Sequence, residues 1–268
     1  MIRRPEIGKL AFRYQVPERT IQKDYVITRV LRELAPAMAS VGLRFKGGTC
    51  LKKCFFAEYR FSEDLDFTLE QPALTDQPYA ELDSVARRLT ASGLTLELGD
   101  PIVRPTGRTY HAAVTGPLGG GDKLKIDITT PELLVFDAVD KPLLDEYSDA
   151  EMSVCVRCYA LEEIFLEKLV CLLDPKRIQP RDLYDLVSLS NDGAVDVEAA
   201  CWRFNEKARF KRLDPSGLRE ALDRKSAQLK RAWETQLSEQ LRPESLPGYE
   251  DSARSLLRLL KGRVRKVL

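Results

Sequence analysis

KGGT at residues 46–49 and RFSEDLDF at residues 60–67 are the stretches that decide the fold of this 268-residue chain. In an extended strand, successive side chains point to opposite faces. Asp64 and Asp66 are therefore expected on one face of a strand, while the apolar residues beside them enter a core. The two upstream glycines are typical of a tight turn. Together the stretches predict a short strand, a turn into a helix, and a second strand that carries two carboxylates.

Two parallel carboxylates repel each other unless a cation lies between them. Mg²⁺ suits such a pair, because proteins often hold it by one or two carboxylates together with substrate phosphates. A helix that starts at Gly47 and Gly48 turns its first N–H groups toward an anion, and we expect Gly48 to need the positive φ of the turn. A phosphate cradle beside a metal pair is typical of phosphoryl or nucleotidyl transfer.

A third carboxylate follows on a later strand. Residues 123–129 alternate cleanly, with apolar side chains on one face and Lys125, Asp127 and Thr129 on the other. If this strand neighbours the Asp64 strand, Asp127 can reach the same metal site, and three acids on adjacent strands could hold two metals. The alternative is an ordinary polar face of an edge strand.

A second charged group lies further along the chain. Lys168 is close to the apolar stripe of its predicted helix, so its stem is expected to be buried and its ammonium to point into a cleft. There it could hold a triphosphate as a compact charge. Glu163, Glu167 and Asp174 are expected near one another along this helix, and Asp182 opens the next one, where the helix dipole favours an acid. The alternative is helix capping with surface ion pairs, each worth little.

The periodicity predicts a mixed α/β front and an all-helical back, with the junction between Glu146 and Leu161. A helix is expected from Glu18 to about Gly42. Strands are expected at residues 43–46, within 60–70, and at 94–98, 109–115 and 123–129, further helices at 47–55 and 79–92, and a loop at 72–78. From Ala160 on the pattern is helical, with breaks near Pro175, Gly193, Pro215 and Pro247.

The composition favours a globular protein, with 44% hydrophobic and 31% charged residues and a net charge of +1. The charge is unevenly distributed. Residues 201–268 hold 17 Lys/Arg and 9 Asp/Glu, a net +8, whereas the rest holds 25 and 32, a net −7. A basic region on an acidic body indicates a polyanionic partner. The alternative is a set of solvated helix faces.

The six cysteines are expected to be reduced thiols. We find no secretory signal behind Met1 and no apolar run long enough for a bilayer, so we expect a cytoplasmic protein without a membrane partner. Cys155 and Cys158 have the spacing of half a zinc site but lack a convincing second pair, which favours structural thiols. Cys50 and Cys54, at helical i, i+4 spacing, are interpreted as small buried residues.

These motifs, in this order, resemble the AbiEii/AbiGii toxin family of nucleotidyltransferase-like toxins. The family belongs to type IV toxin–antitoxin and abortive-infection systems and includes the mycobacterial MenT toxins. The resemblance covers about a third of the chain and rests on four segments: Gly47-Gly48-Thr49, Arg60-x-Ser62-x-Asp64-x-Asp66-Phe67, Glu167-Lys168-Leu169 and Arg181-Asp182-x-Tyr184-Asp185-Leu186.

The resemblance implies an α+β fold. Residues 1–155 would form a minimal nucleotidyltransferase core of the DNA polymerase β type, and residues 156–268 a helical domain that completes the active site and binds RNA. It also implies roles for single residues. Metal would be bound by Asp64 and Asp66, with Asp127 as the third carboxylate by its strand position alone. The triphosphate would be contacted by Gly47, Gly48, Thr49, Arg60, Ser62 and the catalytic Lys168. The last catalytic acid would be Asp182 or Asp185, with Asp182 preferred.

The function implied is a toxin that uses Mg²⁺ and a nucleoside triphosphate to add nucleotides to RNA, with the tRNA 3′ end as acceptor, thereby stopping translation. The basic back, chiefly Arg209, Lys211 and Arg212, would hold the RNA. Further candidates there are Arg203, Lys207, Lys261, Arg263, Arg265 and Lys266. A cognate AbiEi-type antitoxin is an implied partner. Two alternatives stay open: transfer of a nucleotide to a protein hydroxyl, and a non-catalytic module that only binds nucleotide.

Overall fold

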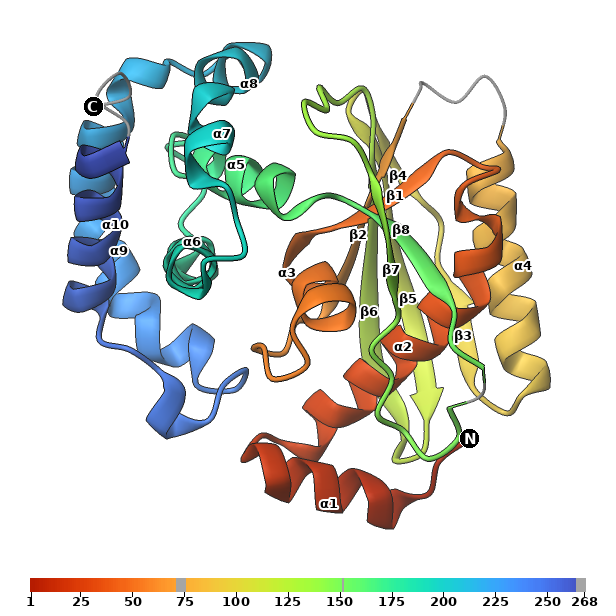
Figure 1. Cartoon of the computed structure of the whole chain (residues 1–268). Coiled ribbons are helices and arrows are strands. Elements are labelled where there is room, and N and C mark those ends of the chain that lie inside the picture. Colours follow the sequence, from red (N-terminus) through yellow and green to blue (C-terminus); the bar gives the residue numbers. More distant parts are fainter. Residues whose placement is uncertain (71–75, 151, 264–268) are drawn as a thin grey trace. The chain divides into compact units, whose positions relative to one another are not determined.

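The computed structural model describes residues 1–70, 76–150 and 152–263 (Figure 1). The chain divides into two compact units. Unit 1 comprises Met1–Glu132 and Ala138–Cys158, and unit 2 comprises Leu133–Asp137 and the chain from Tyr159 onward. Among the described residues, no helix is both long and apolar enough to cross a bilayer.

Unit 1 is built on one mixed eight-stranded sheet with the order β3-β5-β6-β2-β1-β8-β7, and β4 pairs with β5. The strands are β1 (Leu43–Lys46), β2 (Asp64–Leu69), β3 (Thr95–Leu98), β4 (Ile102–Arg104), β5 (Gly107–Gly116), β6 (Gly119–Thr129), β7 (Val139–Pro142) and β8 (Cys155–Cys158). β2 runs parallel to β6 and antiparallel to β1, while β1 runs parallel to β8. The carboxylate strand β2 therefore lies in the interior of the sheet.

The helices of unit 1 are α1 (Arg4–Tyr14), α2 (Glu18–Met38), α3 (Gly47–Cys50) and α4 (Gln77–Ala91), with a π-helix at Leu51–Phe55 that continues α3. α2 and α4 contact each other and pack on the sheet, α2 on β5, β6 and β8 and α4 on β3. The apolar positions of β2, Leu65 and Phe67, are fully buried beside Ile126 and Ile128 of β6. Burial of this face leaves the acidic positions of β2 on the opposite face.

Unit 2 is helical. Its elements are α5 (Leu161–Cys171), α6 (Pro180–Asp192), α7 (Val197–Trp202), α8 (Phe204–Phe210), α9 (Leu218–Leu237), α10 (Tyr249–Arg263) and the 3₁₀ turns Pro215–Gly217 and Pro243–Ser245. α5 packs against α6, α7 and α8, and α6 packs against α9 and α10. The segment Leu133–Asp137 joins this unit because the Glu163 carboxylate accepts hydrogen bonds from the Val135 and Phe136 N–H groups, at 3.0 and 2.9 Å.

The α+β class predicted from the sequence is confirmed, and most predicted elements are present. The sequence pattern did not reveal α1, β4, β7 and β8. Three of these are strands of three or four residues. The loop predicted at 72–78 falls largely on residues 71–75, outside the described part of the chain, and α4 already begins at Gln77.

Candidate functional site

Three carboxylates lie on one face of two adjacent strands in unit 1. β2 pairs in parallel with β6, and Asp66 is the register partner of Asp127. Asp64 lies two positions before Asp66 and therefore on the same face. All three side chains are partly exposed, whereas the alternating apolar residues are buried. The strand of Asp127 therefore neighbours the strand of Asp64, as the third metal ligand requires. Three carboxylates supply only oxygen donors, which fit Mg²⁺.

Cationic and hydroxyl groups surround these acids. Asp127 accepts a hydrogen bond from Thr109 Oγ1 at 2.6 Å and forms an ion pair with Lys125. Lys46 at the end of β1 is the antiparallel register partner of Asp66. The sequence pattern assigned no role to Lys46 and Lys125, although Lys125 lies two residues before Asp127 and so shares its face. These cations reduce the repulsion that three unpaired carboxylates would create.

The glycine turn lies directly against the acidic strand. Gly47 has φ +81°, and a Cβ there would lie 2.6 Å from Asp66 Oδ2. The expectation that Gly48 needs the positive φ is therefore wrong, because Gly47 is the left-handed residue. Gly48 has a different constraint, since a Cβ there would collide with the Arg60 guanidinium. Each glycine is needed for the close approach of one charged side chain.

The other predicted nucleotide-binding residues are largely buried beside this turn. Thr49 Oγ1 donates to the Asp64 carbonyl oxygen at 2.5 Å, which ties the turn to the start of β2. Arg60 is only 1% exposed and donates from Nη1 to the Phe61 carbonyl at 3.2 Å. Ser62 is also buried. The structure thus brings Gly47, Gly48, Thr49 and Arg60 to the acidic strand, with the Thr49 hydroxyl engaged by the backbone.

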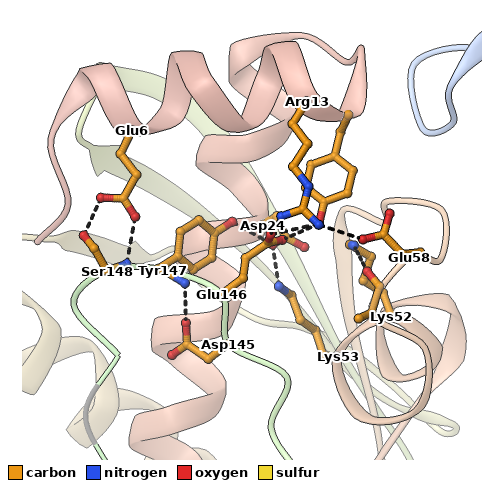
Figure 2. A network of polar contacts seen from close by, with 12 residues as sticks. Glu6, Arg13, Asp24, Lys52, Lys53, Glu58, Asp145, Glu146, Tyr147 and Ser148 are labelled. Atoms are coloured by element: carbon orange, nitrogen blue, oxygen red, sulfur yellow. Dashed lines mark hydrogen bonds and ion pairs between the residues drawn. The ribbon is translucent and has the colours of Figure 1, made fainter.

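A buried polar network anchors the helix that follows the turn (Figure 2). Lys53, in the π-helix, forms an ion pair with Asp24 of α2, and Tyr147 Oη donates to Asp24 Oδ2 at 2.7 Å. Burial, followed by the Asp24 charge, raises the pKa of Tyr147 well above its usual value, so the phenol stays a proton donor. Lys52 Nζ donates to the Ala57 carbonyl at 2.7 Å. These contacts fix the direction in which the chain leaves the glycine turn.

Unit 2 holds the second predicted cluster. Lys168 Nζ lies 2.8 Å from Asp182 Oδ1 and 3.0 Å from Asp185 Oδ2, and all three residues are buried. Arg177 Nε lies 2.6 Å from Asp182 Oδ2. Burial alone would raise the pKa of Asp182, but the Lys168 ammonium and the Arg177 guanidinium outweigh it and hold that pKa well below its usual value. Both candidate acids bind Lys168, and Asp182 also binds Arg177.

A second buried pair in unit 2 corrects one RNA-binding expectation. Lys207 is fully buried, forms an ion pair with Glu163 and lies 3.4 Å from Glu167 Oε1. Lys207 therefore cannot contact an RNA backbone from the surface of the folded unit. Glu163 and Glu167 do lie close together, as expected from their spacing, but the lysine that joins them was not foreseen from the sequence.

The remaining basic candidates differ in position. Arg209, Lys211 and Arg212 are exposed around the end of α8. Phe210, between them, is 43% exposed, and Lys211 Nζ lies 6.0 Å from the centre of its ring. Arg203 binds Glu206 at 2.8 Å and Lys261 is exposed. Arg265 and Lys266 lie outside the described residues, as does the side chain of Arg263.

The cysteines are grouped differently from their sequence spacing. All six are free, and Cys155 is exposed while Cys158 is buried. Cys158 lies beside Cys50 and Cys54, and hydrogen bonds from these two thiols lower its pKa to about 5. Cys50 and Cys54 are buried, as expected. No local pattern indicated that Cys158 joins them, because more than a hundred residues separate it from Cys50.

Comparison with protein families gives one match over most of the chain. The family model described as "Nucleotidyl transferase AbiEii toxin, Type IV TA system" matches residues 29–255. A comparison with curated individual proteins finds no match.

Comparison with solved structures gives a similar fold, that of MenT4, and two weaker likenesses. MenT4, a nucleotidyltransferase toxin from Mycobacterium tuberculosis H37Rv, is similar with a TM-score of 0.71 at 19% identity, over 97% of this chain and 90% of that one. An antigenic nucleotidyltransferase-like protein from Paracoccidioides brasiliensis gives a TM-score of 0.43 at 14% identity, over 84% and 96% of the two chains. ANT(2")-Ia in complex with adenylyl-2"-tobramycin gives 0.39 at 16%, over 68% and 97%. The fold is that of the nucleotidyltransferases.

Proposed function

The chain belongs to the AbiEii family of nucleotidyl transferase toxins of type IV toxin–antitoxin systems, and from this premise we propose that it transfers a nucleotide from a nucleoside triphosphate to the 3′ end of tRNA. Transfer to that end would block aminoacylation and stop translation. A type IV toxin implies an antitoxin, and we propose one of the AbiEi type acting with it in the cytoplasm.

One observation carries the proposal: the carboxylates of Asp64, Asp66 and Asp127 share a face beside a glycine turn. Asp64, Asp66 and Asp127 would hold Mg²⁺, since their donor atoms are the hard oxygens that this ion takes. When bound, the ion would supply positive charge for the triphosphate and lower the pKa of an attacking hydroxyl. Lys125 and Lys46 supply further positive charge on the same face.

We assign phosphate binding to the turn itself. Backbone N–H groups at Gly47, Gly48 and Thr49, at the start of the helix, would donate to phosphate oxygens. Arg60 lies against Gly48 and adds a guanidinium to this region. Thr49 would act through its N–H group, since its hydroxyl is held by the Asp64 carbonyl.

The proposed reaction is an in-line displacement. A ribose hydroxyl of the acceptor would form a bond to the α-phosphorus as the bond to the bridging oxygen breaks, releasing pyrophosphate. The proposal assigns Lys168, and Asp182 or Asp185, to the same reaction, so the loss of Lys168 should abolish transfer as well. It also retains residues 1–155 as the nucleotidyltransferase core and 156–268 as the helical, RNA-binding domain.

The proposed RNA contact is the end of α8. Arg209, Lys211 and Arg212 are exposed cations, and Phe210 among them offers a surface on which a base can stack. Charge and an exposed aromatic ring together are typical of single-stranded nucleic-acid binding, and the acceptor end of a tRNA is single-stranded. Lys207 is not part of this surface.

The test is incubation of the protein with total tRNA, Mg²⁺ and each α-labelled nucleoside triphosphate in turn. We expect label on tRNA, with pyrophosphate released in equal amount, and no label with Asp66→Asn. Glu97→Gln is the matched control, an exposed acid on β3 of the same sheet, and should label tRNA as the wild type does.

Two other outcomes would refute the assignment to RNA. Label on protein that does not depend on tRNA would show transfer to a protein hydroxyl. Tight triphosphate binding without pyrophosphate release, with every RNA tested, would show a module that only binds nucleotide.

A further inference from the structure

Three cysteines far apart in the sequence converge in the core of unit 1. Cys50 is the last residue of α3, Cys54 lies in the π-helix, and Cys158 ends β8. β8 pairs in parallel with β1, and Cys158 is the register partner of Phe45. Because the chain leaves β1 through the glycine turn, this pairing brings Cys158 beside the first two turns of the helix that follows.

The sulfur atoms are close enough to share one ion. The three Sγ atoms all lie within 4.8 Å of one another. For any three atoms separated by no more than this distance, a position exists that is at most about 2.8 Å from each of the three sulfurs, and an ion could occupy it. Zinc–thiolate bonds are about 2.3 Å long. Inward shifts of about 0.5 Å therefore suffice, which rotation of the side chains can supply without movement of the backbone.

The chemistry of the cluster is sulfur alone. The exposed fractions of Cys50, Cys54 and Cys158 are 0%, 4% and 0%. No histidine or carboxylate joins the group among the described residues. Thiolates select soft ions such as Zn²⁺ and Cu⁺, and they do not suit the hard Mg²⁺ expected at the carboxylates. The two groups of ligands in unit 1 therefore differ in the ions that they would take.

We propose that Cys50, Cys54 and Cys158 bind a single thiophilic d¹⁰ ion, Zn²⁺ or Cu⁺, as a structural site. Binding forms three metal–sulfur bonds and releases the thiol protons to solvent, with no change of oxidation state. Ligand number and charge favour different ions: three ligands favour Cu⁺, and charge favours Zn²⁺. Three ligands fall short of the four that structural zinc takes. Charge favours Zn²⁺, because three thiolates leave a net −1 with Zn²⁺ and −2 with Cu⁺ in a buried position.

The ion would act on the glycine turn through the chain. Cys50 directly follows Thr49, and Cys54 lies in the same π-helix as Lys53, which forms an ion pair with Asp24 of α2. An ion that joins these two cysteines to β8 would fix the helix at a second place. This inference does not depend on nucleotide transfer, and its test needs no activity measurement.

The experiment starts from protein purified without oxygen in a non-thiol reductant. The full chain is loaded with Zn²⁺ or Cu⁺ in separate samples, passed through a chelating column and assayed for metal by mass spectrometry. Co²⁺ serves as a spectroscopic probe, since thiolate-to-cobalt charge transfer reports sulfur ligands. Cys54→Ala and Cys158→Ala are the test variants. Cys155→Ala, at the exposed start of β8, and Cys201→Ala, buried in unit 2, are the matched controls.

We expect one ion per wild-type chain, the same in both controls, and none in Cys54→Ala or Cys158→Ala. The more tightly held of the two metals identifies the ion. A rise in the melting temperature of the wild type with added metal, of the same size in Cys155→Ala and Cys201→Ala, provides a second measurement that does not depend on the stability of the test variants.

Three results would overturn the proposal. The first is less than a tenth of an ion per wild-type chain with either metal. The second is metal that Cys158→Ala retains at the wild-type level. The third is a mass about 2 Da lower than that of the reduced chain, which would show two of the sulfurs joined in a disulfide.

Discussion

Replacement of Lys53 by Met should destabilise unit 1 far more than the loss of an ordinary ion pair. Lys53 and Asp24 are each about 2% exposed, and Tyr147 Oη donates to the same Asp24 oxygen as Lys53. In Lys53→Met the Asp24 carboxylate stays buried with the phenol as its remaining donor in this network. Removal of one partner of a buried pair costs about 3–5 kcal/mol.

That cost is large against the whole stability of a domain, which is about 5–15 kcal/mol. For a unit of about 150 residues, each kcal/mol lowers the melting temperature by about 2–4 °C, so we expect a loss of roughly 6–20 °C. Asp24→Asn together with Lys53→Met should cost less than the sum of the single changes, because the double variant leaves no unpaired charge.

The measurement is urea unfolding followed by circular dichroism, with hydrogen exchange resolved by peptide to assign the loss to unit 1. Lys23→Met is the matched control. Lys23 lies on α2 next to Asp24, and its Nζ is 2.6 Å from Glu63 Oε2, but the two side chains are 24% and 37% exposed. Its loss should cost less than about 1 kcal/mol. The reasoning is refuted if Lys53→Met costs no more than Lys23→Met, or if the effects of the two buried changes simply add.

The carboxylate face, the glycine turn, the Lys168 cluster and the basic surface each give a further prediction. Asp66→Ala should abolish transfer with an unchanged or higher melting temperature, since it removes like-charge repulsion; near-normal turnover would disprove the metal assignment. Gly48→Val should weaken triphosphate binding more than tRNA binding in separate titrations, because its side chain displaces Arg60; equal losses would indicate unfolding. Because the pKa of Asp182 is lowered in the folded state, this residue adds stability above its unfolded pKa, and that stability is lost as the pH falls toward the folded pKa. The free energy of unfolding, measured between pH 6 and pH 3, should therefore fall more with pH in the wild type than in Lys168→Met. Parallel curves for the two proteins would contradict this. Charge reversal at Arg209, Lys211 and Arg212 should weaken tRNA binding and flatten the dependence of tRNA affinity on salt, with little effect on triphosphate affinity. An unchanged salt slope would show that this surface does not bind the RNA.

The parts of the molecule that the sequence predicted well are those with a local signal. Alternation around Asp64 and Asp66 is visible within eight residues, and it placed Leu65 and Phe67 in the core. The same rule placed Asp127 on the polar face of its strand. That β6 neighbours β2 is a long-range pairing that alternation alone does not predict, and the position of Asp127 beside Asp66 depends on it.

The parts that the sequence pattern did not reveal depend on contacts between distant segments. A lysine such as Lys207 is expected at the surface from its residue type. The packing of α8 against α5 buries it beside Glu163. Gly47 and Gly48 are adjacent and chemically identical, so sequence could not tell which takes positive φ and which faces Arg60. Cys158 was paired by spacing with Cys155, yet its spatial neighbours precede it by more than a hundred residues.

The pairing of β1 with β8 has a consequence for the order of events during synthesis. β1 is complete at Lys46, but its parallel neighbour ends at Cys158. A ribosome adds about 5–20 residues per second, so roughly 6–20 seconds separate the translation of the two strands. Over that interval the nascent chain can pair β1 with β2 on one side only, leaving the other edge open to strands of other chains. Pairing of the late strand β8 with β1 ends this exposure of the sheet edge.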